Sequence, residues 1–181
     1  QQIGGSYVHV NSLMTGYESE HTYSPKPSDL VAVRKAALLF EVGAGLEVWV
    51  ASLVKNAGNG SLRVVTTSKD IELIQDHPEP AGTSHSHEHA AGNPHVWLDP
   101  AAAATMVQHI SDAMAAADPA HATDYRTNTA TYLQALTRVQ DESLARLRSL
   151  PSRAIIVHHP AWPYFARRYD LHIAGTIQIF F

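Results

Sequence analysis

Short apolar runs alternate with longer amphipathic stretches along most of this chain, which predicts an α/β fold of parallel strands separated by helices. The runs with the length and composition of strands are residues 7–10, 37–42, 62–66, 153–157 and 171–181. The stretches with helical spacing of apolar positions are residues 28–36, 46–55, 99–117, 118–150 and 161–169. We therefore expect a parallel-sheet lobe with flanking helices.

The stretch 118–150 is the longest helical pattern. Its apolar residues recur near helical spacing, at Ala122, Tyr125, Tyr132, Leu136, Val139, Leu144 and Leu147. Pro119 suits a helix start, and Pro151 ends the pattern. Roughly 30 residues at 1.5 Å each make a rod of about 45 Å, longer than one small domain needs. The predicted organisation is a first α/β lobe at 1–117, a long interlobe helix at 118–150 and the beginning of a second α/β lobe at 151–181.

Length and composition limit the class of protein. The chain has 181 residues, enough for one well-buried domain or for one domain and part of another. Its net charge is −4 with scattered basic residues, so nucleic-acid binding is not expected. No apolar run approaches the roughly 20 residues of a membrane helix. The chain begins at Gln1 and stops inside a strand-like run, so we expect it to be truncated at both ends.

Three histidines stand at or near predicted junctions between regular elements, at His21, His95 and His159. Neutral imidazole is the commonest nitrogen ligand for zinc, and the chain has no cysteine that could supply a thiolate. Separations of 74 and 64 residues exclude a local finger, so these side chains would meet only through the tertiary structure. The pattern indicates a metal-binding protein.

Each histidine also has a structural interpretation. His21 could be an exposed loop residue, His95 a core residue bonded to the backbone, and His159 a satisfied residue at a strand end. His158 competes with His159, but neighbours at a strand end face opposite sides, so only one can enter a given site.

The composition changes to Pro, Gly, Ser, Glu and His between residues 76 and 94, which predicts a flexible loop. His85, His87 and His89 alternate within it. Such a tract is typical of an auxiliary metal-collecting segment, which could raise the local metal concentration near a primary site. A merely solvating loop is the alternative.

The remaining motifs do not indicate catalysis. The chain has no nucleophile elbow, phosphate loop or His-Glu-x-x-His helix. Ser28 or Asp29 is expected to cap the helix at 28–36, and Asp99 to cap the helix that follows it. We expect Glu47 to complement the dipole of the helix at 46–55, with no further role.

Several stretches together resemble the zinc- and manganese-binding periplasmic solute-binding proteins of ABC importers. They are residues 2–5, 20–29, 43–47, 93–100 and 159–165. The resemblance implies two α/β lobes joined by one long helix, with the metal in the cleft between them. It also implies that a strand precedes residue 2 and that most of the second lobe follows residue 181.

The same resemblance implies His21 and His95 as ligands from the first lobe and His159 as the ligand from the second. Glu20, used by some zinc members, is a possible fourth ligand, with water or a loop histidine as alternatives. Manganese members usually have a carboxylate where His159 stands, so Zn²⁺ is favoured over Mn²⁺. Pro160 replaces an acidic residue common at that position in the family.

The expected function is therefore capture of Zn²⁺ outside the cytoplasm and its delivery to the membrane permease of an ABC importer. We expect a monomer that is periplasmic or lipid-anchored and is not an enzyme. One alternative is a zinc-dependent hydrolase, because three histidines and a water can also be catalytic. The other is a manganese-binding or adhesin-like surface lipoprotein.

Overall fold

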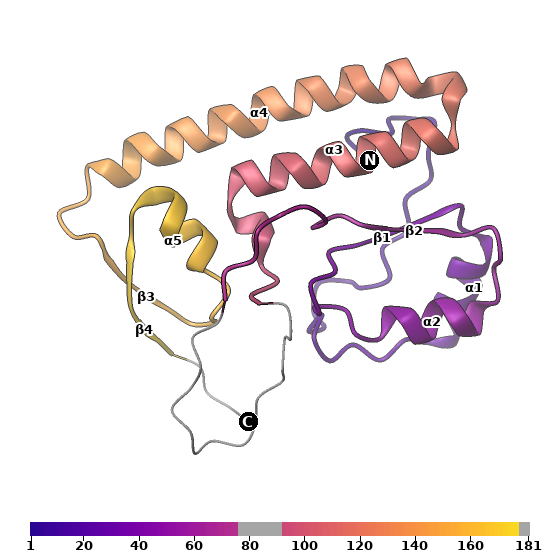
Figure 1. The fold of residues 1–181 in the computed structure, drawn as a ribbon, viewed down its shortest axis with the longest axis horizontal. Coiled ribbons are helices and arrows are strands. Elements are labelled where there is room, and N and C mark those ends of the chain that lie inside the picture. Colours follow the sequence, from indigo (N-terminus) through magenta and orange to yellow (C-terminus); the bar gives the residue numbers. More distant parts are fainter. Residues whose placement is uncertain (76–91, 178–181) are drawn as a thin grey trace.

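The computed structural model describes residues 1–75 and 92–177 and contains two small parallel sheets (Figure 1). Strand β1 (Leu38–Glu41) pairs with β2 (Arg63–Thr66), and β3 (Ala154–Val157) pairs with β4 (His172–Thr176). A helix lies between the strands of each pair in the sequence, as parallel pairing requires. The predicted α/β fold class is confirmed.

The sheet of β1 and β2 lies with helices α1 (Pro27–Lys35) and α2 (Val50–Ala57) on one side of the molecule (Figure 1). The apolar faces of the helices and strand β1 share one core of buried side chains, formed by Val33, Leu39, Val50, Leu53 and Ala57. Removal of this apolar area from water stabilises the packing of α1 and α2 against β1.

Two long helices run side by side above both sheets (Figure 1). They are α3 (Pro100–Ala117) and α4 (Ala122–Arg148), separated by the 3₁₀ turn η2 (Pro119–His121). The expected helix at 118–150 therefore begins later, because the chain reverses direction at this turn. The 27 residues of α4 span about 40 Å.

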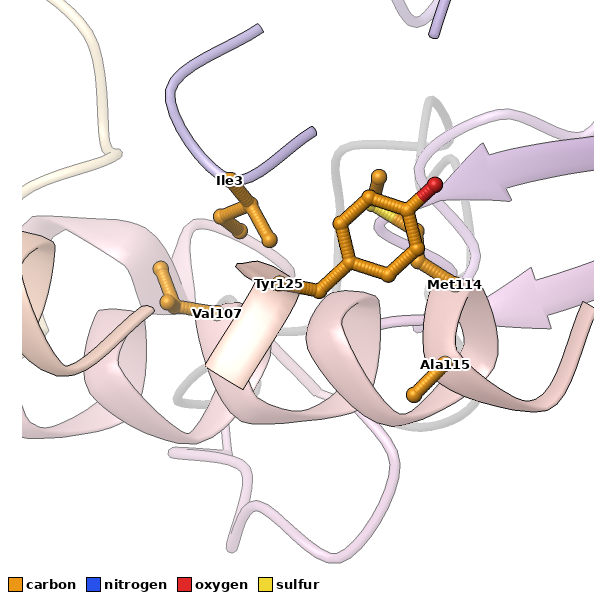
Figure 2. Packing of buried hydrophobic residues seen from close by; sticks show 5 residues of the cluster. All are labelled: Ile3, Val107, Met114, Ala115 and Tyr125. Carbon is orange, nitrogen blue, oxygen red and sulfur yellow. The ribbon is translucent and has the colours of Figure 1, made fainter. Parts of the chain in front are cut away.

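A second core fixes the N-terminal segment against these helices. Its buried members are Ile3, Val107, Met114, Ala115 and Tyr125, and Figure 2 shows Ile3 pointing towards the helix pair. Asn128 supports the same contact, since its side-chain amide donates to the carbonyl of Ile3 at 2.9 Å.

Helix α5 (Pro163–Tyr169), which lies between β3 and β4 in the sequence, contacts β4 and also the segment directly before α3. Arg168 of α5 binds both carboxylate oxygens of Asp99, with Nε–Oδ1 2.6 Å and Nη2–Oδ2 2.8 Å. Asp99 also accepts the backbone N–H of Ala101 at 2.9 Å, which confirms its predicted role as the cap of α3. The pKa of Arg168 is raised because its side chain is bonded to this carboxylate. One buried carboxylate thus connects α3 with α5.

The strand predicted at residues 7–10 is wrong. This segment forms no regular element, and the Tyr7 ring stacks on His121 with centroids 3.9 Å apart. A strand needs a neighbouring strand to pair its backbone N–H and C=O groups, and residues 7–10 pair with neither of the two described sheets. The final strand is also shorter than expected, since β4 ends at Thr176 and residues 178–181 lie outside the described part.

The start of α2 and the role of Glu47 also differ from the prediction. Residues 43–45 all have positive φ (80°, 54° and 80°), which turns the chain before the helix can begin at Val50. Glu47 follows this turn, and its carboxylate accepts the backbone N–H groups of Val42 at 2.8 Å and Gly43 at 2.9 Å. Burial raises the pKa of Glu47, and these two hydrogen bonds oppose that shift. Glu47 therefore stabilises the end of β1.

Other boundaries change less. Helix α1 is capped at Lys26, whose N–H donates to the Asp29 carboxylate at 2.7 Å, so neither Ser28 nor Asp29 is the N-cap. The flexible loop predicted at 76–94 lies outside the described residues up to 91, and its last residues, 92–94, are buried. Within residues 1–75 and 92–177, no helix is long and apolar enough to cross a membrane.

Met114 lies in the core beneath the N-terminal segment, and its replacement tests that core. We expect Met114→Ala to lower the free energy of unfolding by about 2–5 kcal/mol, because it removes buried methylene groups and leaves a cavity. The exposed control Gln134→Ala on α4 should change it by less than about 0.5 kcal/mol. Denaturant unfolding followed by circular dichroism measures both, and equal midpoints would contradict the assignment.

Replacing Arg168 tests the contact between α3 and α5. We expect Arg168→Met to lower the free energy of unfolding by about 1–3 kcal/mol, because the buried carboxylate of Asp99 loses two charge-assisted bonds. The loss should stay below that of a fully buried pair, since the Arg168 side chain is 35% exposed. Arg138→Met on the exposed face of α4 is the matched control. A loss no larger than that of the control would show that solvent replaces this ion pair without penalty.

Candidate metal centre

His21, His95 and His159 come together although they are far apart in the sequence. Each offers one ring nitrogen, and these three atoms all lie within 4.8 Å of one another. The ring centroids of His95 and His159 are 4.9 Å apart, and that of His21 lies 5.4 Å and 5.8 Å from them. In the part of the chain that the structure describes, this is the one set of three or more His, Asp or Glu side chains placed to hold a metal ion.

The spacing of His95 and His159 suits a tetrahedral metal ion. Their Nε2 atoms are 3.1 Å apart. Zinc holds imidazole nitrogens at about 2.0–2.1 Å, so two of its tetrahedral ligands lie about 3.3 Å from each other. The pair therefore needs little adjustment to share one ion.

His95 is the most enclosed of the three, at 4% exposed. It directly precedes the 3₁₀ turn η1 (Val96–Leu98), whose Val96 is fully buried. Its Nδ1 lies 2.9 Å from Oδ1 of Asn93, so the opposite ring nitrogen is the one directed towards His159. A partner on the second nitrogen fixes the orientation of a ligand imidazole.

His21 lies in the loop before α1, and contacts of its neighbours hold that loop. The carbonyl of Glu20 accepts the indole N–H of Trp49 at 3.0 Å. The Trp49 ring packs edge-on against Tyr23 with centroids 4.9 Å apart. The Tyr23 hydroxyl donates to the Asp29 carboxylate at 2.7 Å, and this bond with burial raises the pKa of Tyr23 to about 12. The loop is thus attached to the N-terminal ends of α1 and α2.

His159 follows strand β3, at the carboxyl end where open α/β sheets usually place ligand groups. It is half-buried and faces His95, whereas the neighbouring His158 is exposed. The two adjacent histidines therefore point to different environments, and His159 is the one that enters the cluster.

Two other sets of predicted site residues have different outcomes. Glu20 is half-buried beside His21, but its carboxylate is not among the grouped ligand atoms, so its role as a fourth ligand stays a prediction. The auxiliary residues His85, His87 and His89 lie outside the described part of the chain.

Sequence reasoning missed the residues that support the histidines. Asn93 and Tyr164 contact each other and the segments on either side of the cluster, and Trp49 supports the His21 loop. An asparagine two residues before a candidate ligand was a usable signal, because its side chain can bond to nearby backbone. No local signal indicates the partners of Tyr164 or Trp49, which lie 71 and 29 residues away.

Three imidazoles with no carboxylate in the set can bind a cation of borderline softness and leave a further coordination position to another group. The cluster lies between the β1–β2 side and the β3–β4 side of the molecule, since it draws one residue from the loop before α1, one from the segment before η1 and one from the end of β3. Binding an ion there would join these three segments.

Comparison with known proteins agrees with this geometry. Residues 1–179 match the family ZnuA, described as zinc-uptake complex component A, periplasmic. A Treponema pallidum protein named for metal binding is 29% identical over 185 residues, covering 99% of this chain and 58% of its own length.

Two crystal structures have the same fold over 98% of this chain. One is ZnuA, at 31% identity and a TM-score of 0.85, of which this chain covers 65%. The other is a ZnuA deletion mutant with zinc bound, at 31% identity and a TM-score of 0.84, of which it covers 64%. The chain therefore spans less than two thirds of the length of these relatives. Because the family match extends over nearly all of its residues, the chain belongs to the ZnuA family of periplasmic zinc-uptake components.

Proposed function

We propose that this chain is the metal-binding part of an extracytoplasmic protein that captures Zn²⁺ and delivers it to the permease of an ABC importer. The observation that carries the proposal is the convergence of His21, His95 and His159 from three distant segments onto one point. Histidines that gather by chance on a surface are usually exposed, whereas this cluster has one buried and two half-buried members.

The donor set favours zinc over manganese. Three imidazole nitrogens suit Zn²⁺, whereas Mn²⁺ prefers carboxylate, carbonyl and water oxygens. The ZnuA deletion mutant with zinc bound, similar over 98% of this chain, supports the same ion. Zinc is here the transported substrate.

The fourth position of a tetrahedral zinc would be filled by water, by the carboxylate of Glu20 or by a histidine of the 76–94 loop. Glu20 is the nearest carboxylate in sequence to a member of the cluster, because it directly precedes His21. His85, His87 and His89 would act as an auxiliary site that supplies metal to the primary one.

The proposed organisation is a first lobe at 1–117, a linking helix at 118–150 and the start of a second lobe at 151–181. The family description supports a periplasmic location and a role as a transport component with a membrane partner. We propose that the protein acts as a monomer and performs no catalysis, in agreement with a site that would bind and release the ion without using it as a Lewis acid.

Titration of the metal-free protein with Zn²⁺ tests the site directly. We expect the triple variant His21→Ala, His95→Ala, His159→Ala to lose zinc affinity by more than about 1,000-fold, because all three proposed ligands are removed. His158→Ala is the matched control, since it removes the exposed neighbour of His159 and should bind zinc like the unchanged protein. Calorimetry with chelator competition, repeated with Mn²⁺, measures both affinity and preference.

The loop histidines stay intact in this experiment. Tight binding that persists in the triple variant would therefore move the primary site to the loop and contradict the proposal. Tighter binding of Mn²⁺ than of Zn²⁺ would contradict the choice of substrate.

Zinc affinity should fall as the pH is lowered from about 7.5 to about 5, because a protonated imidazole has no lone pair for the metal and each ligand must be neutral to bind. Competition with a chelator of known proton affinity at each pH measures the change. Circular dichroism at the same pH values serves as the control for folding. A constant affinity across this range in a folded protein would exclude a site made of imidazoles.

A further inference from the structure

We propose that Asn93 is a positioning residue for zinc capture, which selects the nitrogen of His95 that faces the metal and connects His95 with the segment that carries His159. The proposal rests on the function proposed above. It concerns a side chain that is shielded from solvent, since Asn93 is 2% exposed.

The amide of Asn93 can adopt one orientation. Its Oδ1 accepts the backbone N–H of His95 at 3.1 Å, and its Nδ2 donates to the carbonyl of Pro160 at 2.9 Å. The flipped amide would place two donors against each other at the first contact and two acceptors at the second. The backbone partners therefore fix which atom is the oxygen.

This orientation determines the tautomer of His95. Nδ1 of His95 lies 2.9 Å from the same Oδ1, which can only accept, so Nδ1 carries the proton. The lone pair is then on Nε2, the atom that lies 3.1 Å from Nε2 of His159. In free imidazole the proton exchanges between the two nitrogens, but here the protein keeps the ligand nitrogen available.

The same side chain connects two ligands. Pro160 directly follows His159, so the bond from Asn93 Nδ2 to the Pro160 carbonyl sets the distance between the His95 and His159 segments. The Asn93 amide thereby connects two segments that are 67 residues apart in the sequence.

The backbone of Asn93 is fixed as well. Its N–H donates to the carbonyl of Ile74 at 2.8 Å, and its carbonyl accepts the hydroxyl of Tyr164 at 2.6 Å. Tyr164 is fully buried in α5 and also accepts the N–H of Ile74 at 2.9 Å. With both ends of the residue held, the amide cannot follow a displaced imidazole, and water has little access to replace it.

The test compares two variants that replace the Asn93 amide with one variant that removes a hydrogen bond to the Asn93 backbone. Asn93→Ala removes both side-chain contacts, whereas Asn93→Asp keeps an acceptor for His95 and loses the donor to Pro160. Tyr164→Phe is the control, because it removes the hydroxyl that contacts the Asn93 backbone and leaves the amide intact. Proton–nitrogen correlation spectra of protein labelled with ¹⁵N-histidine report the tautomer in the metal-free state, and chelator competition reports zinc affinity.

We expect His95 to be protonated on Nδ1 in the unchanged protein and in Asn93→Asp, and to populate the Nε2–H form in Asn93→Ala. Zinc affinity should fall about 10–100-fold in Asn93→Ala, and by less in Asn93→Asp. Tyr164→Phe should lower the unfolding temperature but keep the tautomer of His95.

Three results would overturn the proposal. They are an Nε2-protonated His95 in the unchanged metal-free protein, a loss of affinity in Asn93→Ala with the tautomer unchanged, and a changed tautomer with zinc affinity kept within about twofold of the unchanged protein. The first needs no variant, so it applies even if Asn93→Ala does not fold. If the unchanged protein binds no zinc, the proposed function is wrong. If the unchanged protein and Asn93→Ala bind zinc equally well, the proposed function stands and the role of Asn93 is wrong.

Discussion

The largely buried segment from Asn93 to Asp99 is the constraint on which the rest of the site depends. It meets the β3–β4 side at both ends, through Asn93 to Pro160 and Tyr164 and through Asp99 to Arg168. Because buried polar groups need partners, these contacts hold the segment at both ends. His95 lies between the two ends, so its position is set before any metal arrives.

The three histidines are held in different ways. His95 is fixed by a side-chain amide, and His159 by its place at the end of β3 next to Pro160. His21 depends on its loop, whose attachment passes through the Glu20 carbonyl to Trp49. His95 and His159, which have the firmer supports, also have a spacing close to that of two zinc ligands. The His21 ring lies farther from both. Preorganised ligands reduce the entropy lost when an ion is bound.

The sequence was sufficient where a local pattern decides the structure and insufficient where a distant partner does. Periodicity and turn signals predicted α1, β1, β2, α3 and most of α4, and the strand-end position of His159 was visible from the run before it. Tyr7 to Val10 has strand composition but no neighbouring strand, and Glu47 has a helix-start context but serves the turn after β1. The partners of Asn93 and Asp99 on the β3–β4 side, Pro160 and Arg168, lie 67 and 69 residues away, so no local pattern could reveal them.

Stability and site geometry come from different parts of the molecule. The two apolar cores, one around α1 and α2 and one between α3, α4 and the N-terminal segment, contain none of the three histidines. The contacts around the site are instead largely polar, and such contacts add little net stability because each replaces a bond to water. These polar contacts orient the ligand side chains, because hydrogen bonds depend on direction and apolar packing does not. Because the two apolar cores do not include the ligands, binding of an ion at the proposed site would not require either core to rearrange.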